Sequence, residues 1–168
     1  HERYLLGWRE YEMKTQVAHE QTSFQEFEVL DVIDSRMNKI EEYERSLSKD
    51  GSYESQHPEF FKPDRVVYLD KIMQSRLSGV EAYHEALVHP AMLAHTDPRR
   101  VAIIGGGEGA TLREVLKHKT VQKCVMVEID GEMVAASKKH LPQWNNCSDL
   151  AGSAGSCFDD PRAEIYFE

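Results

Sequence analysis

A cluster of glycines follows a short apolar run and precedes a stretch with helical periodicity. Gly105, Gly107 and Gly109 come directly after the apolar residues 101–104. Glycines at such a turn let the backbone approach a ligand closely, and a following helix N-terminus offers N–H groups without partners. Glu128 ends the next apolar run, where its carboxylate could accept both hydroxyls of a ribose. The spacing predicts an adenosine-type ligand, and the alternative is a tight strand-to-helix turn with a solvated carboxylate.

Glu108 lies at the centre of this glycine turn and limits what the turn could bind. A dinucleotide would present its pyrophosphate to the helix N-terminus, where a carboxylate at this position would repel it. A carboxylate there suits a cation such as a sulfonium or an ammonium group. The charge at this one position therefore favours a relative of S-adenosylmethionine over a dinucleotide.

The segments around the turn predict one βαβ unit of a parallel sheet over residues 101–130. Residues 101–104 form an uninterrupted apolar run, which is typical of a strand buried on both faces. The elements expected after it are a helix over 111–118, a strand over 124–129, a helix over 132–141, a loop over 142–161 and a strand over 163–167.

The first part of the chain has strand patterns. One or two antiparallel strands are predicted around Phe27, Val29 and Ile33, which share one parity, as in a half-buried strand. Residues 35–64 are charged and rich in turn formers and prolines, which indicates an inserted connection. A short return strand is expected over residues 66–69.

A linking helix is expected between these strands and the βαβ unit. Ser78 and Glu81 have the spacing of a capping box, so the helix should begin near Gly79. Pro90 should kink or end it. Residues 95–98 have the composition of a loop and mark a plausible domain boundary.

These patterns predict an α/β fold in which a small β-rich domain over residues 1–97 is joined to a nucleoside-binding, Rossmann-like half-domain over residues 98–168. No apolar run approaches the roughly 18 to 20 residues that a membrane span needs, so no membrane association is expected. The net charge of −9 argues against a nucleic-acid partner, which would need a basic face, and is compatible with a cationic small-molecule substrate.

The spacing of the cysteines and histidines predicts neither a disulfide nor a metal site. Cys124, Cys147 and Cys157 fit neither a paired disulfide framework nor C-x-x-C spacing, so a reducing, cytoplasmic location is expected. His84 and His89 with the intervening glutamate resemble a zinc-protease motif, but they are five positions apart, which rotates them off one helical face. For His84 by itself, the alternative to a functional role is a partly buried structural histidine.

Several segments resemble one family. Residues 101–118, VAIIGGGEGATLREVLKH, are similar to the signature segment of spermidine and spermine synthases, and residues 127–130 are similar to the end of that family's second strand. Further similar segments lie at 83–85, 88–90 and 93–95 before the signature, at 69–74, at 22–25 in the first hairpin, and at 158–162 before the third strand. The resemblance covers most of residues 11–34 and 66–168.

The resemblance implies a small β-domain packed on a methyltransferase-like Rossmann domain, usually as a homodimer, with no metal and no prosthetic group. The implied reaction transfers an aminopropyl group from decarboxylated S-adenosylmethionine, the co-substrate, to a primary amine and releases methylthioadenosine. The donor-site residues it implies are Gln25, Gln74, Gly105, Gly107, Glu108, Gly109 and Glu128, and Tyr83 and His84 would line the amine channel. In this scheme Glu128 holds the ribose hydroxyls, and Glu108 binds the donor's aminopropyl ammonium.

The chain departs from the family pattern at three points. Glu108 replaces the usual aspartate and looks more like the thermospermine-synthase branch, which leaves the acceptor amine open between putrescine and spermidine. Lys71 replaces a turn glycine, so it must either adopt a strained conformation or change the turn. The Asp-Ala pair that would read adenine, and the aspartate that acts as general base, are both expected beyond Glu168.

Two other functions remain open at this point. One is a methyltransferase on the same fold, which the residues of the amine channel argue against. The other is a homologue without catalytic activity that binds a nucleoside or a polyamine, or that serves as a dimerisation module.

Overall fold

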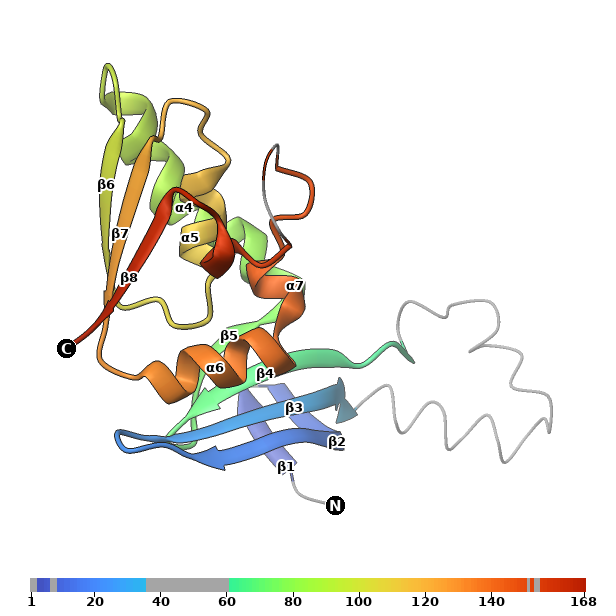
Figure 1. Cartoon of the computed structure of the whole chain (residues 1–168). Coiled ribbons are helices and arrows are strands. Elements are labelled where there is room, and N and C mark those ends of the chain that lie inside the picture. Colours follow the sequence, from blue (N-terminus) through green and yellow to red (C-terminus); the bar gives the residue numbers. More distant parts are fainter. Residues whose placement is uncertain (1–2, 7–8, 36–60, 151, 153–154) are drawn as a thin grey trace.

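The computed structural model describes residues 3–6, 9–35, 61–150, 152 and 155–168. In this part of the chain, two sheets contain the strands, and helices α4, α5, α6 and α7 lie against them (Figure 1). Most of the inserted connection predicted over residues 35–64 lies outside the described residues. None of the helices described is long and apolar enough to cross a membrane.

The first sheet has five antiparallel strands in the order β1-β2-β3-β4-β5. They are β1 (Arg3–Leu6), β2 (Arg9–Gln21), β3 (Glu26–Asp34), β4 (Asp64–Leu69) and β5 (Ile72–Arg76). The predicted strands of the first hairpin are β2 and β3, and the predicted return strand is β4. Sequential strands pair with their neighbours, so this sheet is a meander of hairpins.

Strand β3 is buried on both faces, so the prediction of a half-buried strand is wrong. Phe27 and Val29 belong to one apolar cluster, which includes Val67 and Trp144. Leu30 is fully buried in a second cluster on the other face, formed with residues of β2 and β4. The alternation of apolar residues in the sequence identified one buried face of β3 correctly. It could not show that neighbouring strands supply apolar side chains to the second face of β3.

The turn between β4 and β5 carries the strain expected at Lys71. Lys71 has a φ of 65° and the preceding Asp70 has a φ of 49°, a region that non-glycine residues rarely adopt. The ammonium of Lys71 lies 2.6 Å from Oε1 of Glu26 and 3.0 Å from Oε2 of Glu28. Lysine therefore occupies the glycine position in the left-handed conformation and pairs with two carboxylates of the adjacent hairpin.

Helix α4 (Val80–Ala94) follows a 3-10 turn, η1 (Leu77–Gly79), close to the predicted start. The predicted capping box does not form, because the hydroxyl of Ser78 donates to Oδ2 of Asp64 at 2.6 Å and no side chain caps the helix. Pro90 does not end the helix, which continues to Ala94. Val88 and Met92 of α4 pack into the core of the second sheet.

The second sheet is parallel, in the order β6-β7-β8, as the βαβ pattern predicts. Its elements are β6 (Arg100–Ile104), α5 (Ala110–Leu116), β7 (Lys123–Glu128), α6 (Gly131–His140), α7 (Pro142–Asn145), the 3-10 turn η2 (Cys157–Asp159) and β8 (Ala163–Phe167). Helices α4 and α5 cover one face of this sheet, and α6 lies across the first sheet (Figure 1). The segment predicted as a loop over 142–161 contains α7 and η2.

Strand β6 is not buried on both faces, which corrects the prediction. Ile103 faces the helices and is 7% exposed, whereas its neighbour Ile104 is 92% exposed. The strand lies at one edge of the sheet, and α4 and α5 both pack on the same face (Figure 1). The apolar run correctly identified a strand, but no described element covers its second face.

Cys147 and Cys157 form a disulfide, so the expectation of unpaired cysteines is wrong. The loop between them returns the chain from α7 to η2, and both cysteines are fully buried in the core of the second sheet. Two cysteines separated by ten positions follow no diagnostic spacing, so only the path of this loop could reveal the pairing. Cys124 is buried with a free thiol, and burial raises its pKa to about 11.

Candidate functional site

A pocket with a volume of about 360 Å³ opens where the two sheets meet α4, within the size range of small-molecule sites. It brings together residues from the first hairpin, β5, α4, the glycine turn and the end of β7. Among its lining residues are seven of the nine candidate site residues: Gln25, Gln74, Tyr83, His84, Gly107, Glu108 and Glu128. Positions that are far apart in the sequence therefore share one cavity.

The glycine turn forms one wall of this pocket. The N–H of Gly105 donates to the carbonyl of Val127 at 2.8 Å, which ties the end of β6 to β7. A Cβ on Gly107 would lie 3.2 Å from Oε2 of Glu128 and 3.2 Å from Sδ of Met133. A side chain at this position would therefore have to displace the Glu128 carboxylate or the Met133 sulfur by a few tenths of an ångström.

Glu128 is held in a defined orientation at the end of β7. Its side chain is buried, and Oε1 accepts backbone N–H groups from Ile129 at 2.9 Å and from Asp130 at 3.3 Å. Oε2 is the oxygen nearest the glycine turn. The backbone thus fixes one carboxylate oxygen and directs the other toward the pocket, an arrangement that can present a charged acceptor to a pair of hydroxyls.

The first hairpin reaches the pocket through a buried hydrogen-bond network. Asp130 is fully buried, and its Oδ2 accepts from the hydroxyl of Thr22 at 2.6 Å and from Nε2 of Gln25 at 3.0 Å. Its Oδ1 caps α6 by accepting the N–H of Met133 at 2.9 Å. The same residue therefore caps a helix and positions Gln25, a role that the sequence patterns did not predict.

Gln74 and Tyr83 line the same pocket from more exposed positions. Gln74 is exposed on β5, and its Nε2 donates to the carbonyl of Ile72 in its own strand, at 3.4 Å. Tyr83 is 65% exposed, and its ring meets the imidazole of His84 edge-on, with 4.9 Å between centroids. Both side chains have freedom to adjust to a ligand.

His84 and Glu108 contact each other directly across the pocket. Nε2 of His84 lies 2.7 Å from Oε1 of Glu108, and Nδ1 lies 2.7 Å from the carbonyl of Val80. Burial lowers the pKa of His84, but the hydrogen bonds to Glu108 and Val80 outweigh it, so that this pKa is raised from its ordinary value. The two residues that the resemblance places in the amine and donor sites thus contact each other, and they form an ion pair when His84 is protonated.

Gly105 and Gly109 do not line the pocket. Gly109 has a φ of 88°, and a Cβ there would lie 2.6 Å from Cβ of Asn145 and 2.7 Å from the ring of Phe158. It is therefore a packing position at the start of α5, against α7 and η2. Gly105 has a φ of 77°, with open space around its Cα.

The pocket also has apolar walls that the sequence patterns did not single out. They are formed by Leu69, Leu87, Ile104, Ile129 and Met133. Ile129 is 56% exposed just after the end of β7. Its position between two acidic residues, Glu128 and Asp130, is the one sequence signal that it lies at the mouth of a site.

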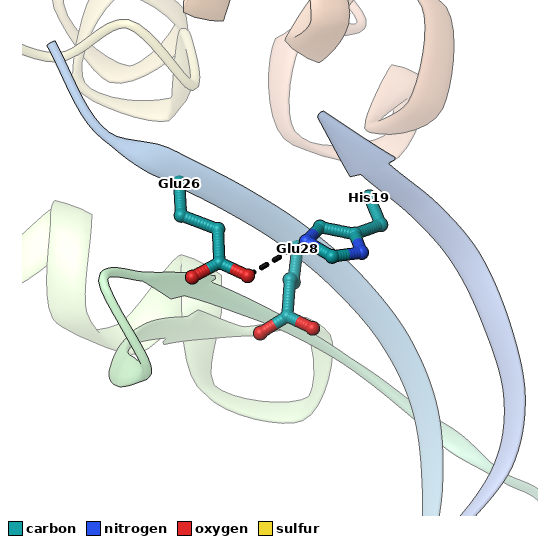
Figure 2. A group of neighbouring side chains, drawn as sticks. All are labelled: His19, Glu26 and Glu28. Carbon is teal, nitrogen blue, oxygen red and sulfur yellow. Dashed lines mark hydrogen bonds and ion pairs between the residues drawn. The ribbon is translucent and has the colours of Figure 1, made fainter. Parts of the chain in front are cut away.

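A group of ionisable side chains lies outside the pocket, on the first hairpin. Figure 2 shows His19 from β2 with Glu26 and Glu28 from β3, and Nε2 of His19 lies 2.6 Å from Oε1 of Glu26. The ammonium of Lys71 also contacts both carboxylates, and it holds the pKa of Glu26 below its ordinary value. An internal cation therefore already pairs with both carboxylates and offsets one of their two negative charges.

A second such group joins α4 to α5. Ligand-type atoms of Glu85, His89 and Glu114 lie within 4.8 Å of one another. Nε2 of His89 is 3.5 Å from Glu114, while Nδ1 is 3.0 Å from Nε2 of His118. The ammonium of Lys117 lies 2.8 Å from the fully buried carboxylate of Glu114, which already has a cationic partner. The expectation that the chain holds no metal stays a prediction.

The fold and the pocket define a class: an α/β protein with a methyltransferase-like parallel sheet, a glycine turn and a fixed carboxylate at the next strand end, joined to a small antiparallel sheet. Comparison with known proteins narrows that class. Residues 80–168 match the family model of the spermine/spermidine synthase domain, which begins at the first residue of α4. Because that match covers more than half of the chain, the chain belongs to this family.

Curated relatives and solved structures point to the same family. The chain is 54% identical over 101 residues to polyamine aminopropyltransferase 1 of Hyperthermus butylicus, covering 60% of this chain and 32% of that protein. It is 52% identical over 105 residues to polyamine aminopropyltransferase 2 of Pseudomonas aeruginosa, covering 62% and 28%. This chain therefore matches about a third of the length of these relatives.

Two solved structures have the same arrangement over nearly the whole chain. The crystal structure of spermidine synthase from Thermotoga maritima matches with a TM-score of 0.67 and 31% identity, covering 95% of this chain and 43% of that one. A spermidine synthase in complex with the transition-state analogue AdoDATO matches with a TM-score of 0.67 and 31% identity, covering 95% and 41%. The likeness thus includes the first sheet, which lies outside the matched family domain.

Proposed function

We propose that this chain forms the donor-binding part of a polyamine aminopropyltransferase. The reaction is transfer of an aminopropyl group from decarboxylated S-adenosylmethionine to putrescine or spermidine, with release of methylthioadenosine. The single observation that carries the proposal is that Glu128, Glu108 and Gln25 line one pocket, although they come from three separate elements. A fixed carboxylate for hydroxyls and a second carboxylate for a cation match the two polar ends of such a donor.

The chemistry places modest demands on the protein. The sulfonium of the donor already activates the carbon that is attacked, so the protein mainly aligns a neutral amine for in-line attack and accepts one proton. Glu128 would hold the ribose hydroxyls, with Gln25 and Gln74 beside the nucleoside. Tyr83 and His84, on the α4 side of the pocket, would border the path of the amine.

The general base is not assigned to any residue of this chain. A primary ammonium with a pKa near about 10 is almost wholly protonated at neutral pH, so a base that accepts its proton is required. We propose that the base belongs to sequence outside these 168 residues, in a protein that works as a homodimer. The nucleoside site can be tested by binding alone, without turnover, in a longer protein that contains this chain.

Calorimetric binding of methylthioadenosine tests the proposal. Glu128→Gln keeps the shape of the side chain but removes the charged acceptor, which should weaken binding by about 1 to 3 kcal/mol. Glu164→Gln is the matched control, because Glu164 lies on β8, away from the pocket lining, and pairs with Lys123. Equal affinity of wild type and Glu128→Gln, with retained folding, would refute the ribose-binding role.

A further inference from the structure

Both ring nitrogens of His84 face oxygen acceptors. Nδ1 lies 2.7 Å from the carbonyl of Val80, and Nε2 lies 2.7 Å from Oε1 of Glu108. A carbonyl and an ionised carboxylate only accept hydrogen bonds, so both nitrogens can donate only in the imidazolium form. The side chain of His84 is 4% exposed and that of Glu108 is 14% exposed, which limits screening of the pair by water.

We infer that His84 is the internal cation of the pocket, and that a ligand ammonium binding to Glu108 drives the proton of His84 into solution. This inference rests on the proposed function, because the ligand in question is a nucleoside with a primary ammonium group. In the exchange, the N–H bond at Nε2 of His84 breaks, its proton goes to water or buffer, and the imidazole stays neutral. The ligand ammonium then neutralises Glu108 in its place.

The surroundings of His84 favour this exchange. Its facing groups are the carboxylate of Glu108 on the glycine turn, the carbonyl of Val80 and the ring edge of Tyr83 on α4, and the guanidinium of Arg113 on α5. Glu108 is the nearest of these charges and holds the proton, while Arg113 opposes it. A second cation on Glu108 adds to that opposition, and like charges about 5 Å apart typically shift a pKa by a unit or more.

The exchange makes ligand binding depend on pH in a defined direction. The pKa of His84 is raised, so at pH values below it the imidazolium occupies Glu108 and competes with the ligand. As the pH rises through that pKa, the competing proton is lost and affinity for the ammonium increases, by at most about tenfold per pH unit for one linked proton. A nucleoside without an ammonium group has no such dependence.

Calorimetry on a longer protein that contains these 168 residues tests the exchange with two probes. One is 5′-deoxy-5′-(3-aminopropylthio)adenosine, which carries an ammonium group and an uncharged sulfur, and the other is methylthioadenosine, which lacks the ammonium. Titration in phosphate and in Tris, buffers of different ionisation enthalpy, counts the protons released. Wild type should release up to about one proton with the ammonium nucleoside and none with methylthioadenosine.

His84→Gln is the diagnostic variant, because its amide can still donate to Glu108 but cannot titrate. It should bind both nucleosides, release no proton, and show a flat affinity across the pH range in which wild type changes. Equal proton release by wild type and His84→Gln overturns the inference while the proposed function stands. Failure of both nucleosides to bind overturns the inference and the proposed function together.

A measurement without ligand keeps the inference testable if a variant binds poorly. Titration of the His84 imidazole followed by NMR should give a raised pKa in wild type, and Glu108→Gln should lower it by more than one unit. The other imidazole signals of the same spectra serve as a folding check. A His84 pKa that is unchanged by Glu108→Gln in a folded chain contradicts the pairing on which the exchange depends.

Discussion

Strand β3 is buried on both faces, whereas strand β6 is buried on one. Their sequence patterns predicted the reverse. β3 has an alternating pattern that suggested one buried face, yet Leu30 and Val29, which face opposite sides, are both fully buried. β6 is a continuous apolar run that suggested two buried faces, yet Ile104 is 92% exposed. The pattern of a strand reports which residues could be buried, whereas the neighbouring elements decide which of them are.

The largest expected effect is on activity. It also tests whether the open face of β6 impairs folding of the chain. We expect the 168-residue chain alone to show no aminopropyl transfer and to fold poorly, because an exposed apolar face and edge favour aggregation. Lack of a general base alone typically costs about 10² to 10⁴ in rate. The measurement is labelled aminopropyl transfer by the chain beside a longer protein that contains it.

Turnover by the chain within tenfold of the longer protein would contradict this prediction. It would show that the general base lies among these 168 residues and that the open face of β6 does no harm.

The second prediction concerns the buried faces of β3. Leu30→Ala should lower the free energy of unfolding by about 3 kcal/mol, because it removes a fully buried side chain and leaves a cavity between β3 and β4. Chemical denaturation of both proteins measures the difference. A cost below about 1 kcal/mol would mean that the second face of β3 is not packed as described.

The smallest effect is expected on the open face of β6. Ile104→Ala should change the free energy of unfolding by less than about 0.5 kcal/mol, because its side chain is already almost fully exposed. Ile104→Lys should raise the highest concentration at which the chain is still monomeric, measured by light scattering. Destabilisation by Ile104→Ala as large as that of Leu30→Ala would remove the contrast between the two strands.

The parallel sheet and the main site residues could be predicted because their signals are local. An apolar run, a glycine cluster and an acidic strand end lie close together in the sequence, and they predicted that β6 and β7 are strands. Gly107 and Glu128 line one pocket, and their binding roles stay predictions. The position of Glu108 between glycines also indicated a cationic neighbour. In the structure the side chain that contacts Glu108 is His84, which is a cation only when its imidazole is protonated.

What the sequence could not show depends on pairs that are distant along the chain. Asp130 contacts Thr22 and Gln25 across more than 100 positions, so nothing local indicates that it joins the two sheets. The bond between Cys147 and Cys157 depends on the path of a loop, and Ser78 bonds to Asp64 instead of capping its own helix. Each of these contacts exists only because the fold brings the partners together.

A crystal structure with methylthioadenosine bound tests the central claim most directly, namely that the pocket between the glycine turn and β7 holds the nucleoside. The account predicts both ribose hydroxyls within hydrogen-bond distance of the Glu128 carboxylate, with Gln25 and Gln74 beside the nucleoside. A nucleoside bound elsewhere, or a ribose turned away from Glu128, would contradict it.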